Sequence, residues 1–348
     1  MIAKNWILGR IESHHQAMDR KWRQLPPFTV LPRSGESSVY YLTPAERSPS
    51  GGVKVIYRHV DELNAMGIPA AVVHDRHDFR CDWFENSTRV VSAKTLRLKR
   101  GDLLVLPECY GAGFGGLPPG VRVVVFNQGP HHTFDQIAME PGRPGAPYSE
   151  LEGLEGILTV SDDGAELLGM VFPQVRLSTA RNVIDERVFY PSDKVPPYRI
   201  SYVPSRRADE LRQILHLLNA RPEIHGGSWQ LVALHGLSER GMADALRGSA
   251  IFLSLSDRDG FGLPPAEAMA CGSYVVGYPG GGGREYFDSA YCSPAQSTTE
   301  VLAALVEAMQ LSGEALRELG AKASASILGR YTAEGLRQDL RSFYGELR

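Results

Sequence analysis

The chain has 348 residues, of which 43% are hydrophobic and 22% are charged, and its formal net charge at pH 7 is -3. This length suits two α/β domains of ordinary size, and the near-neutral charge, without a strongly basic stretch, argues against nucleic acid as a partner. The cysteines, Cys81, Cys109, Cys271 and Cys292, include no C-x-x-C pair. They therefore do not indicate a structural zinc site, and we expect free thiols in a reducing compartment.

The composition along the chain predicts a cytoplasmic protein. Residues 1–22 lack the apolar core and the cleavage pattern of a signal peptide, and no run approaches the length of a transmembrane helix. Peripheral contact with a membrane and the oligomeric state stay open.

The first part of the chain, after a helix expected within residues 1–22, predicts a strand–loop–helix–strand unit. Strands are expected at Ser38–Thr43 and Pro69–His74, with a helix over Val53–Gly67 between them. The pair Gly51-Gly52 precedes this helix, where missing Cβ atoms would let a ligand approach the backbone. The G-x-G-x-x-G spacing is lacking, so a nicotinamide or flavin site is not indicated. A plain tight turn is the alternative interpretation of the two glycines.

Polar side chains follow a later strand of the same predicted sheet. Strands are expected at Asp102–Leu106 and Val121–Phe126, and the second is followed by Asn127, Gln128 and, a few residues later, His131. Ligands of open α/β sheets bind outside the carboxyl ends of the strands. Asn127 or Gln128 could therefore hydrogen-bond a sugar, and His131 could assist a proton transfer. The alternative is a Gly-Pro turn with surface histidines.

The second part of the chain repeats this pattern with basic residues. A strand expected at Arg199–Val203 is followed by Arg206 and Arg207, and then by a helix. Fixed charge and several donors near a helix N-terminus suit a diphosphate, although a surface pair of arginines is the alternative. The next expected strand, Trp229–Leu234, runs into His235-Gly236-Leu237.

The most informative stretch is DGFGLPPAEAMACG, which starts at Asp259 and lies between strands expected at Ile251–Leu255 and Tyr274–Tyr278. Its glycines would expose backbone N–H groups at the start of a short helix, a setting suited to phosphate. Asp259 on the loop and Glu267 in the helix suit hydroxyl groups, because carboxylates accept hydrogen bonds. Phosphates flanked by hydroxyls describe a nucleotide sugar. A glycine-rich connection with two solvated acids is the alternative.

This stretch resembles the C-terminal signature of retaining GT-B glycosyltransferases, similar to glycosyltransferase family 4 (glycosyl transferases group 1). The family pattern is Glu-x7-Glu with Gly-Phe-Gly-Leu-Pro between the acids, and here Asp259 replaces the first Glu. The resemblance implies an α/β protein with two Rossmann-like, doubly wound domains that face each other across a cleft. The domains would be residues 1–190 on the acceptor side and 191–332 on the donor side, with a last helix, 333–348, that crosses back to the first.

The resemblance also implies roles for individual residues. Glu267 would bind the ribose, Asp259 the hydroxyls of the donor sugar, and Arg206 or Arg207 the diphosphate. The implied catalytic set is Asp259, Glu267, Arg206, Arg207, Asn127, Gln128 and His131. The implied donor-binding set is Gly51, Gly52, Arg206, Arg207, His235, Gly236, Leu237, Asp259, Gly260, Phe261, Gly262, Leu263 and Glu267.

The predicted function is that of a retaining, hexosyltransferase-like enzyme. It would move a sugar from a nucleoside diphosphate sugar to a hydroxyl of a glycan or glycoside, and donors based on UDP, GDP and dTDP are not distinguished. Asp257-Arg258-Asp259 spells the Asp-x-Asp metal motif of the other glycosyltransferase fold. Because the arginines would already neutralise the diphosphate, we expect no obligatory metal or other cofactor, while Mg²⁺ bound to the nucleotide stays open.

Two other classes of function stay open from the sequence. One is a non-catalytic protein that binds sugar nucleotides, because the Glu of the family is replaced by Asp259 and no His directly follows Phe126. The other is a different GT-B enzyme, such as an epimerase, a phosphorylase or a pseudo-glycosyl coupling enzyme.

Overall fold

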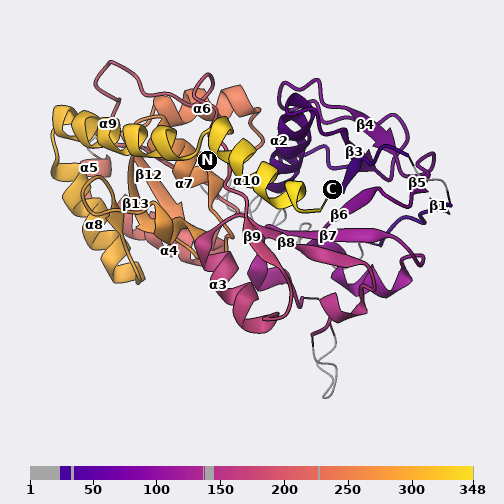
Figure 1. Ribbon diagram of the computed structural model, residues 1–348. Coiled ribbons are helices and arrows are strands. Elements are labelled where there is room, and N and C mark those ends of the chain that lie inside the picture. Colours follow the sequence, from indigo (N-terminus) through magenta and orange to yellow (C-terminus); the bar gives the residue numbers. More distant parts are fainter. Residues whose placement is uncertain (1–23, 33–34, 136, 138–144, 226–227, 348) are drawn as a thin grey trace. The chain divides into compact units, whose positions relative to one another are not determined.

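The computed structural model describes residues 24–32, 35–135, 137, 145–225 and 228–347, and the helix expected within residues 1–22 lies outside these ranges. The described residues divide into two compact units. The N-terminal unit contains those of Asp19–Val183 and Ala333–Arg348, and the C-terminal unit those of Ile184–Thr332. The division thus falls between Val183 and Ile184. Each unit has a parallel sheet with helices, so the predicted α/β class is confirmed (Figure 1).

The N-terminal unit is built, in its described residues, on a seven-stranded parallel sheet in the order β4-β3-β2-β6-β7-β8-β9. Counted along the chain this is 3-2-1-4-5-6-7, which begins with the doubly wound Rossmann order. The order reverses between β2 and β6. The strands are β2 (Val39–Leu42), β3 (Ala70–His74), β4 (Val90–Ser92), β6 (Leu103–Pro107), β7 (Arg122–Asn127), β8 (Leu154–Thr159) and β9 (Leu177–Thr179).

The central strands of this sheet are buried along their whole length, and their sequences are nearly continuous apolar runs such as LLVLP in β6. Such runs are typical of parallel strands that are covered on both faces. Two short strands, β1 (Val30–Leu31) and β5 (Leu98–Lys99), pair separately. The remaining elements are α2 (Gly51–Ala65), α3 (Asp162–Val171), α10 (Ala333–Gly345) and the 3-10 turns η1 (Glu108–Gly116), η2 (Pro130–His132) and η3 (Tyr148–Glu150).

Helix α2 begins earlier than the sequence predicts. Gly51 and Gly52 form its first turn after the N-cap Ser50, and they are not a loop before the helix. The helix ends at Ala65, and Gly67 follows with a φ of 77°, the left-handed conformation that commonly terminates helices.

The last helix, α10, packs within the N-terminal unit beside α2 (Figure 1). The Tyr344 hydroxyl lies 2.8 Å from that of Tyr41 on β2, and Arg337 contacts Glu62 of α2 at 2.7 Å. Helix α10 therefore contributes to the buried core of this unit.

The C-terminal unit is built, in its described residues, on a five-stranded parallel sheet in the order β11-β10-β12-β13-β14. Counted along the chain this is 2-1-3-4-5, the flavodoxin-like doubly wound order, and it reverses between β10 and β12. The strands are β10 (Arg199–Tyr202), β11 (Gln230–Ala233), β12 (Ile251–Leu255), β13 (Tyr274–Tyr278) and β14 (Ser293–Pro294). The helices and turns are α4 (Ala208–Asn219), α5 (Pro222–His225), α6 (Glu239–Arg247), α7 (Leu263–Ala270), η4 (Gly282–Glu285), α8 (Thr298–Gln310) and α9 (Gly313–Arg330).

Within the described part of the chain, no helix combines the length and the apolar character that a membrane span requires.

Candidate functional site

Two of the predicted donor residues, Arg206 and Asp259, meet where the strand order of the C-terminal sheet reverses. The loop after β10 carries Arg206, and the loop after the neighbouring strand β12 carries Asp259. Nη2 of Arg206 lies 3.0 Å from Oδ1 of Asp259. The point of reversal is where open α/β sheets bind ligands, so this ion pair marks the expected ligand position.

The second arginine, Arg207, is held by its own neighbours. It is the N-cap of α4 in a left-handed conformation, with a φ of 41°. Its guanidinium forms ion pairs with Asp257 at 3.1 Å and with Glu210 at 3.2 Å, and it lies over the ring of Tyr278 with Cζ 4.1 Å from the centroid. These contacts join the ends of β10, β12 and β13.

Glu210 is the centre of this network. Its carboxylate accepts hydrogen bonds from the hydroxyls of Tyr278 at 2.5 Å and Thr298 at 2.7 Å, in addition to the contact with Arg207. Burial acts to raise the pKa of Glu210, but these hydrogen bonds outweigh it, and the pKa is lowered. Glu210 is thus an ionised anchor for Arg207.

Asp259 has one carboxylate oxygen engaged and one that is not. Its side chain is 18% exposed, Oδ1 contacts Arg206, and Oδ2 is buried with no hydrogen-bond partner among the described residues. The backbone around it is closely packed: the Asp259 carbonyl accepts from the N–H of Gly282 at 3.2 Å. A Cβ on Gly282 would lie 2.0 Å from the Gly260 carbonyl oxygen, so these two loops require glycine at position 282.

Helix α7 begins directly after this loop. Gly262 is its N-cap, with a φ of 84° that favours glycine. The Tyr286 hydroxyl donates to the carbonyl oxygens of Gly262 at 2.6 Å and Phe261 at 3.1 Å, and the Phe261 ring packs against Tyr286 and Tyr331. Phe261 is buried and holds the loop in place, whereas Glu267, 6% exposed, lies further along α7.

His235, Gly236 and Leu237 follow β11, which borders β10 on the side away from β12. His235 and Gly236 are exposed, and Gly236 has a φ of 62°. Apart from its two chain neighbours, no described residue comes within 4 Å of a Cβ built on Gly236, so this loop presents open backbone.

Three predicted residues of the N-terminal unit, Gly51, Gly52 and Gln128, lie together near the point where its strand order reverses. The Gln128 side chain donates to the carbonyl of Gly52 at 3.1 Å, and the Gln128 backbone N–H donates to Glu108 Oε2 at 3.1 Å. Glu108 directly follows β6, next to β2 in the sheet. Gly51 precedes Gly52 in the first turn of α2, so the two glycines and Gln128 lie together.

Asn127 and His131 are placed differently from Gln128. Asn127 has no exposed surface, and its amide donates to the hydroxyls of Thr133 at 2.8 Å and Tyr148 at 2.7 Å. His131 is exposed on η2. The side chain of Asn127 therefore braces the segment after β7 from inside the unit.

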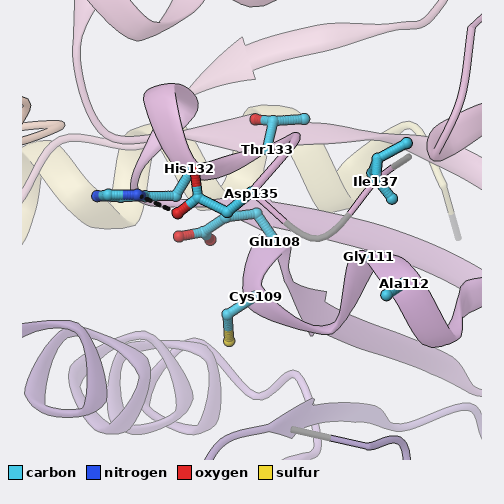
Figure 2. A pocket seen from close by; sticks show the side chains of 8 residues that line it. All are labelled: Glu108, Cys109, Gly111, Ala112, His132, Thr133, Asp135 and Ile137. Carbon is cyan, nitrogen blue, oxygen red and sulfur yellow. Dashed lines mark hydrogen bonds and ion pairs between the residues drawn. The ribbon is translucent and has the colours of Figure 1, made fainter. Parts of the chain in front are cut away.

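A pocket opens beside this segment of the N-terminal unit (Figure 2). Glu108, His132 and Asp135 give it two carboxylates and an imidazole, and His132 Nδ1 lies 2.6 Å from Asp135 Oδ2 (Figure 2). The rest of the lining is Cys109, Gly111, Ala112, Thr133 and Ile137. An imidazole held by a carboxylate in this way can accept or deliver a proton.

Sequence reasoning missed Glu108, His132 and Asp135. The signals for them were present: Glu108 ends a strand at the centre of the sheet, and a His and an Asp three positions apart share one side of a helical turn. The choice of His132 over His131 as the pocket residue depends on the path of η2.

The acids of the Asp257-Arg258-Asp259 motif are each paired with a different arginine. In the portion of the chain with described coordinates, no group of three or more His, Cys, Asp or Glu residues is arranged to hold a metal ion.

Comparisons with known proteins show what this chain is similar to. Residues 206–341 match a family described as glycosyl transferase-like. An α-1,6-glucosyltransferase from Actinobacillus pleuropneumoniae serotype 7 (strain AP76) is 22% identical over 261 residues, which cover 69% of this chain and 72% of that protein. The predicted resemblance to group 1 glycosyltransferases is therefore confirmed, and membership of family 4 in particular stays a prediction.

Solved structures show the fold. Sucrose-phosphate synthase from Thermosynechococcus elongatus superimposes with a TM-score of 0.67 at 12% identity, over 89% of this chain and 99% of that one. The pneumococcal O-GlcNAc transferase GtfA, in complex with UDP and GlcNAc, gives a TM-score of 0.52 at 14% identity, over 71% of this chain and 57% of that one. The predicted GT-B fold is confirmed, and the comparisons together support a glycosyltransferase of this type.

Proposed function

From its GT-B fold and its glycosyl transferase-like residues 206–341, we propose that this glycosyltransferase moves a sugar from a nucleoside diphosphate sugar to a hydroxyl of a glycan or glycoside. The observation that carries the proposal is the ion pair between Arg206 and Asp259, beside the start of α7 and at the point of strand reversal. One cation and one carboxylate in contact suit a ligand that carries both phosphates and hydroxyls.

Arg206 is the arginine that we assign to the diphosphate. Its side chain is 40% exposed and contacts the Asp259 carboxylate, whereas Arg207 is engaged by Asp257, Glu210 and Tyr278. Together with backbone N–H groups in the first turn of α7, Arg206 would stabilise the negative charge that develops on the departing diphosphate. Glu267 would accept hydrogen bonds from the ribose and Asp259 from the sugar.

On the acceptor side, we assign the pocket lined by Glu108, His132 and Asp135. Carboxylates and an imidazole accept hydrogen bonds from sugar hydroxyls, and His132, oriented by Asp135, would take up the proton of the attacking hydroxyl. Gln128 and Gly52 would hold the neighbouring backbone in position. Asn127 acts through Thr133 and Tyr148 and does not touch the substrate.

The proposal includes retention of the anomeric configuration and no obligatory metal. Retention is supported by the resemblance of Asp259–Glu267 to the signature of retaining enzymes. Independence of metal is supported by Arg206, which would bring positive charge to the diphosphate, and by the pairing of Asp257 and Asp259 with arginines. A cytoplasmic location stays a prediction.

The test is turnover of a panel of donors. We expect one of UDP-glucose, GDP-glucose and dTDP-glucose to release its nucleoside diphosphate and to glycosylate one member of a panel of simple glycosides without added metal. Glucose is the first sugar to try because the matched relative is a glucosyltransferase. NMR of the anomeric proton should show the configuration of the donor in the product, and Glu267→Gln should abolish transfer. Binding without turnover of any donor would favour the non-catalytic alternative.

A further inference from the structure

We propose that Asp259 makes the donor site discriminate between the intact nucleoside diphosphate sugar and the free nucleoside diphosphate. Without a donor, its carboxylate neutralises Arg206; with the donor, Arg206 turns to the diphosphate and the carboxylate accepts a sugar hydroxyl instead. This inference rests on the proposed function and extends it from transfer to the release of the nucleotide product.

Two observations carry the inference. The first is the contact between Arg206 Nη2 and Asp259 Oδ1 at 3.0 Å, between side chains that are 40% and 18% exposed, so the diphosphate and the carboxylate compete for the same guanidinium. The second is Asp259 Oδ2, which is buried and has no hydrogen-bond partner in the described part of the chain. A buried carboxylate oxygen without a hydrogen-bond donor is costly. Once Arg206 leaves for the diphosphate, the carboxylate could turn, and a sugar hydroxyl would then supply the missing hydrogen bond.

The free nucleoside diphosphate cannot satisfy Asp259. Its terminal phosphate carries an additional negative charge at the point where the sugar would be attached, and it brings no hydroxyl there. Asp259 would then lose Arg206 to the phosphate and face a like charge. The same carboxylate therefore favours the donor and weakens the binding of the nucleotide product, which helps product release.

Asp257 provides a matched control, because it lies on the same loop and has a contact of the same kind. Its carboxylate is 3.1 Å from Arg207, but Arg207 is held by Glu210 and Tyr278 as well, and Asp257 is 57% exposed. We place Asp257 outside the sugar-binding site.

The experiment measures dissociation constants by calorimetry for UDP and UDP-glucose, and for the GDP and dTDP pairs, with wild type, Asp259→Asn, Asp259→Glu and Asp257→Asn. For the pair that wild type binds, we expect Asp259→Asn to bind the nucleoside diphosphate more tightly and the donor more weakly. The dissociation constant of the nucleoside diphosphate divided by that of the donor should fall about tenfold or more, the scale of one hydrogen bond to a charged group. Asp259→Glu and Asp257→Asn should keep the ratio within about threefold of wild type, which is under 1 kcal/mol.

The outcomes separate the inference from the proposed function. If wild type binds a nucleotide pair but Asp259→Asn changes both constants by the same factor, Asp259 does not discriminate and the inference is wrong, while the donor site stands. An equal fall of the ratio in Asp257→Asn would also overturn the inference, because loss of any negative charge on this loop would then explain the effect. If wild type binds none of the pairs, the proposed function fails and the inference with it.

Discussion

The guanidinium of Arg207 lies over the ring of Tyr278, and both side chains contact the carboxylate of Glu210. This arrangement connects the ends of two strands of the C-terminal sheet through the first turn of α4. Arg206, the next residue along the chain, contacts Asp259 and is more exposed. The two adjacent arginines therefore differ: Arg207 has a structural role, and Arg206 is open to a ligand.

We expect Arg207→Ala to lower the free energy of unfolding of the C-terminal unit by about 1–3 kcal/mol, because Glu210 and Tyr278 lose a partner. Arg206→Ala removes a more exposed ion pair and should change the free energy of unfolding by less than about 1 kcal/mol. Urea unfolding followed by fluorescence gives both values. Equal losses in the two variants would contradict the division of tasks.

The lowered pKa of Glu210 predicts a dependence of stability on pH. A carboxyl group with a lower pKa in the folded than in the unfolded state stabilises the fold at pH values above the unfolded pKa, about 4.3 for Glu. This contribution is lost as the pH falls through the folded pKa. The difference in unfolding free energy between wild type and Glu210→Gln should thus be constant from pH 7 to about pH 5 and should shrink below about pH 4.3. A difference that grows in acid would show that the charge of Glu210 does not stabilise the unit.

Helix α9 sets the position of α7 through a close approach at Gly320. A Cβ there would lie 1.9 Å from the carbonyl oxygen of Gly272, and the nearby Ser324 hydroxyl donates to the Ala270 carbonyl at 2.7 Å. Gly320→Ala should therefore cost about 1–3 kcal/mol through overpacking.

Gly329 of the same helix is the matched control, because apart from its chain neighbours and the nearby backbone of α9 no described atom lies within 4 Å of a Cβ at this position. Gly329→Ala should leave the melting temperature unchanged or raise it, since alanine favours helix by up to about 1 kcal/mol. If the two variants had the same melting temperature, the contact between α9 and the end of α7 would not constrain the packing of this unit.

The pocket of the N-terminal unit predicts a difference between two adjacent histidines. His132 lines the pocket and is held by Asp135, whereas His131, the histidine that the sequence predicts to be functional, is exposed. We expect His132→Ala to lower the transfer rate about a hundredfold, the scale of general base catalysis, without a change in donor affinity. His131→Ala tests the choice made from sequence: a larger loss of transfer in this variant than in His132→Ala would restore His131 as the functional residue.

Local features of the site were predictable from sequence, and long-range pairings were not. The loop at Gly260–Gly262 and the start of α7 follow from glycine at a position with positive φ and from prolines at the start of a helix. The contact between Arg206 and Asp259 requires β10 and β12 to be neighbours, which depends on the order of the whole sheet. The burial of Asn127 and the choice of His132 depend on a short turn whose path has no clear sequence signal.

The measurement that tests the central claim most directly is thermal unfolding of wild type, Arg206→Ala and Arg258→Ala with UDP, GDP and dTDP. Arg258 is an exposed arginine of the same loop and serves as the control. One nucleotide, at a hundred times its dissociation constant, should stabilise wild type and Arg258→Ala by about 2.7 kcal/mol and should leave Arg206→Ala nearly unshifted. No shift with any nucleotide, or an equal shift in Arg206→Ala, would contradict the assignment of the donor site.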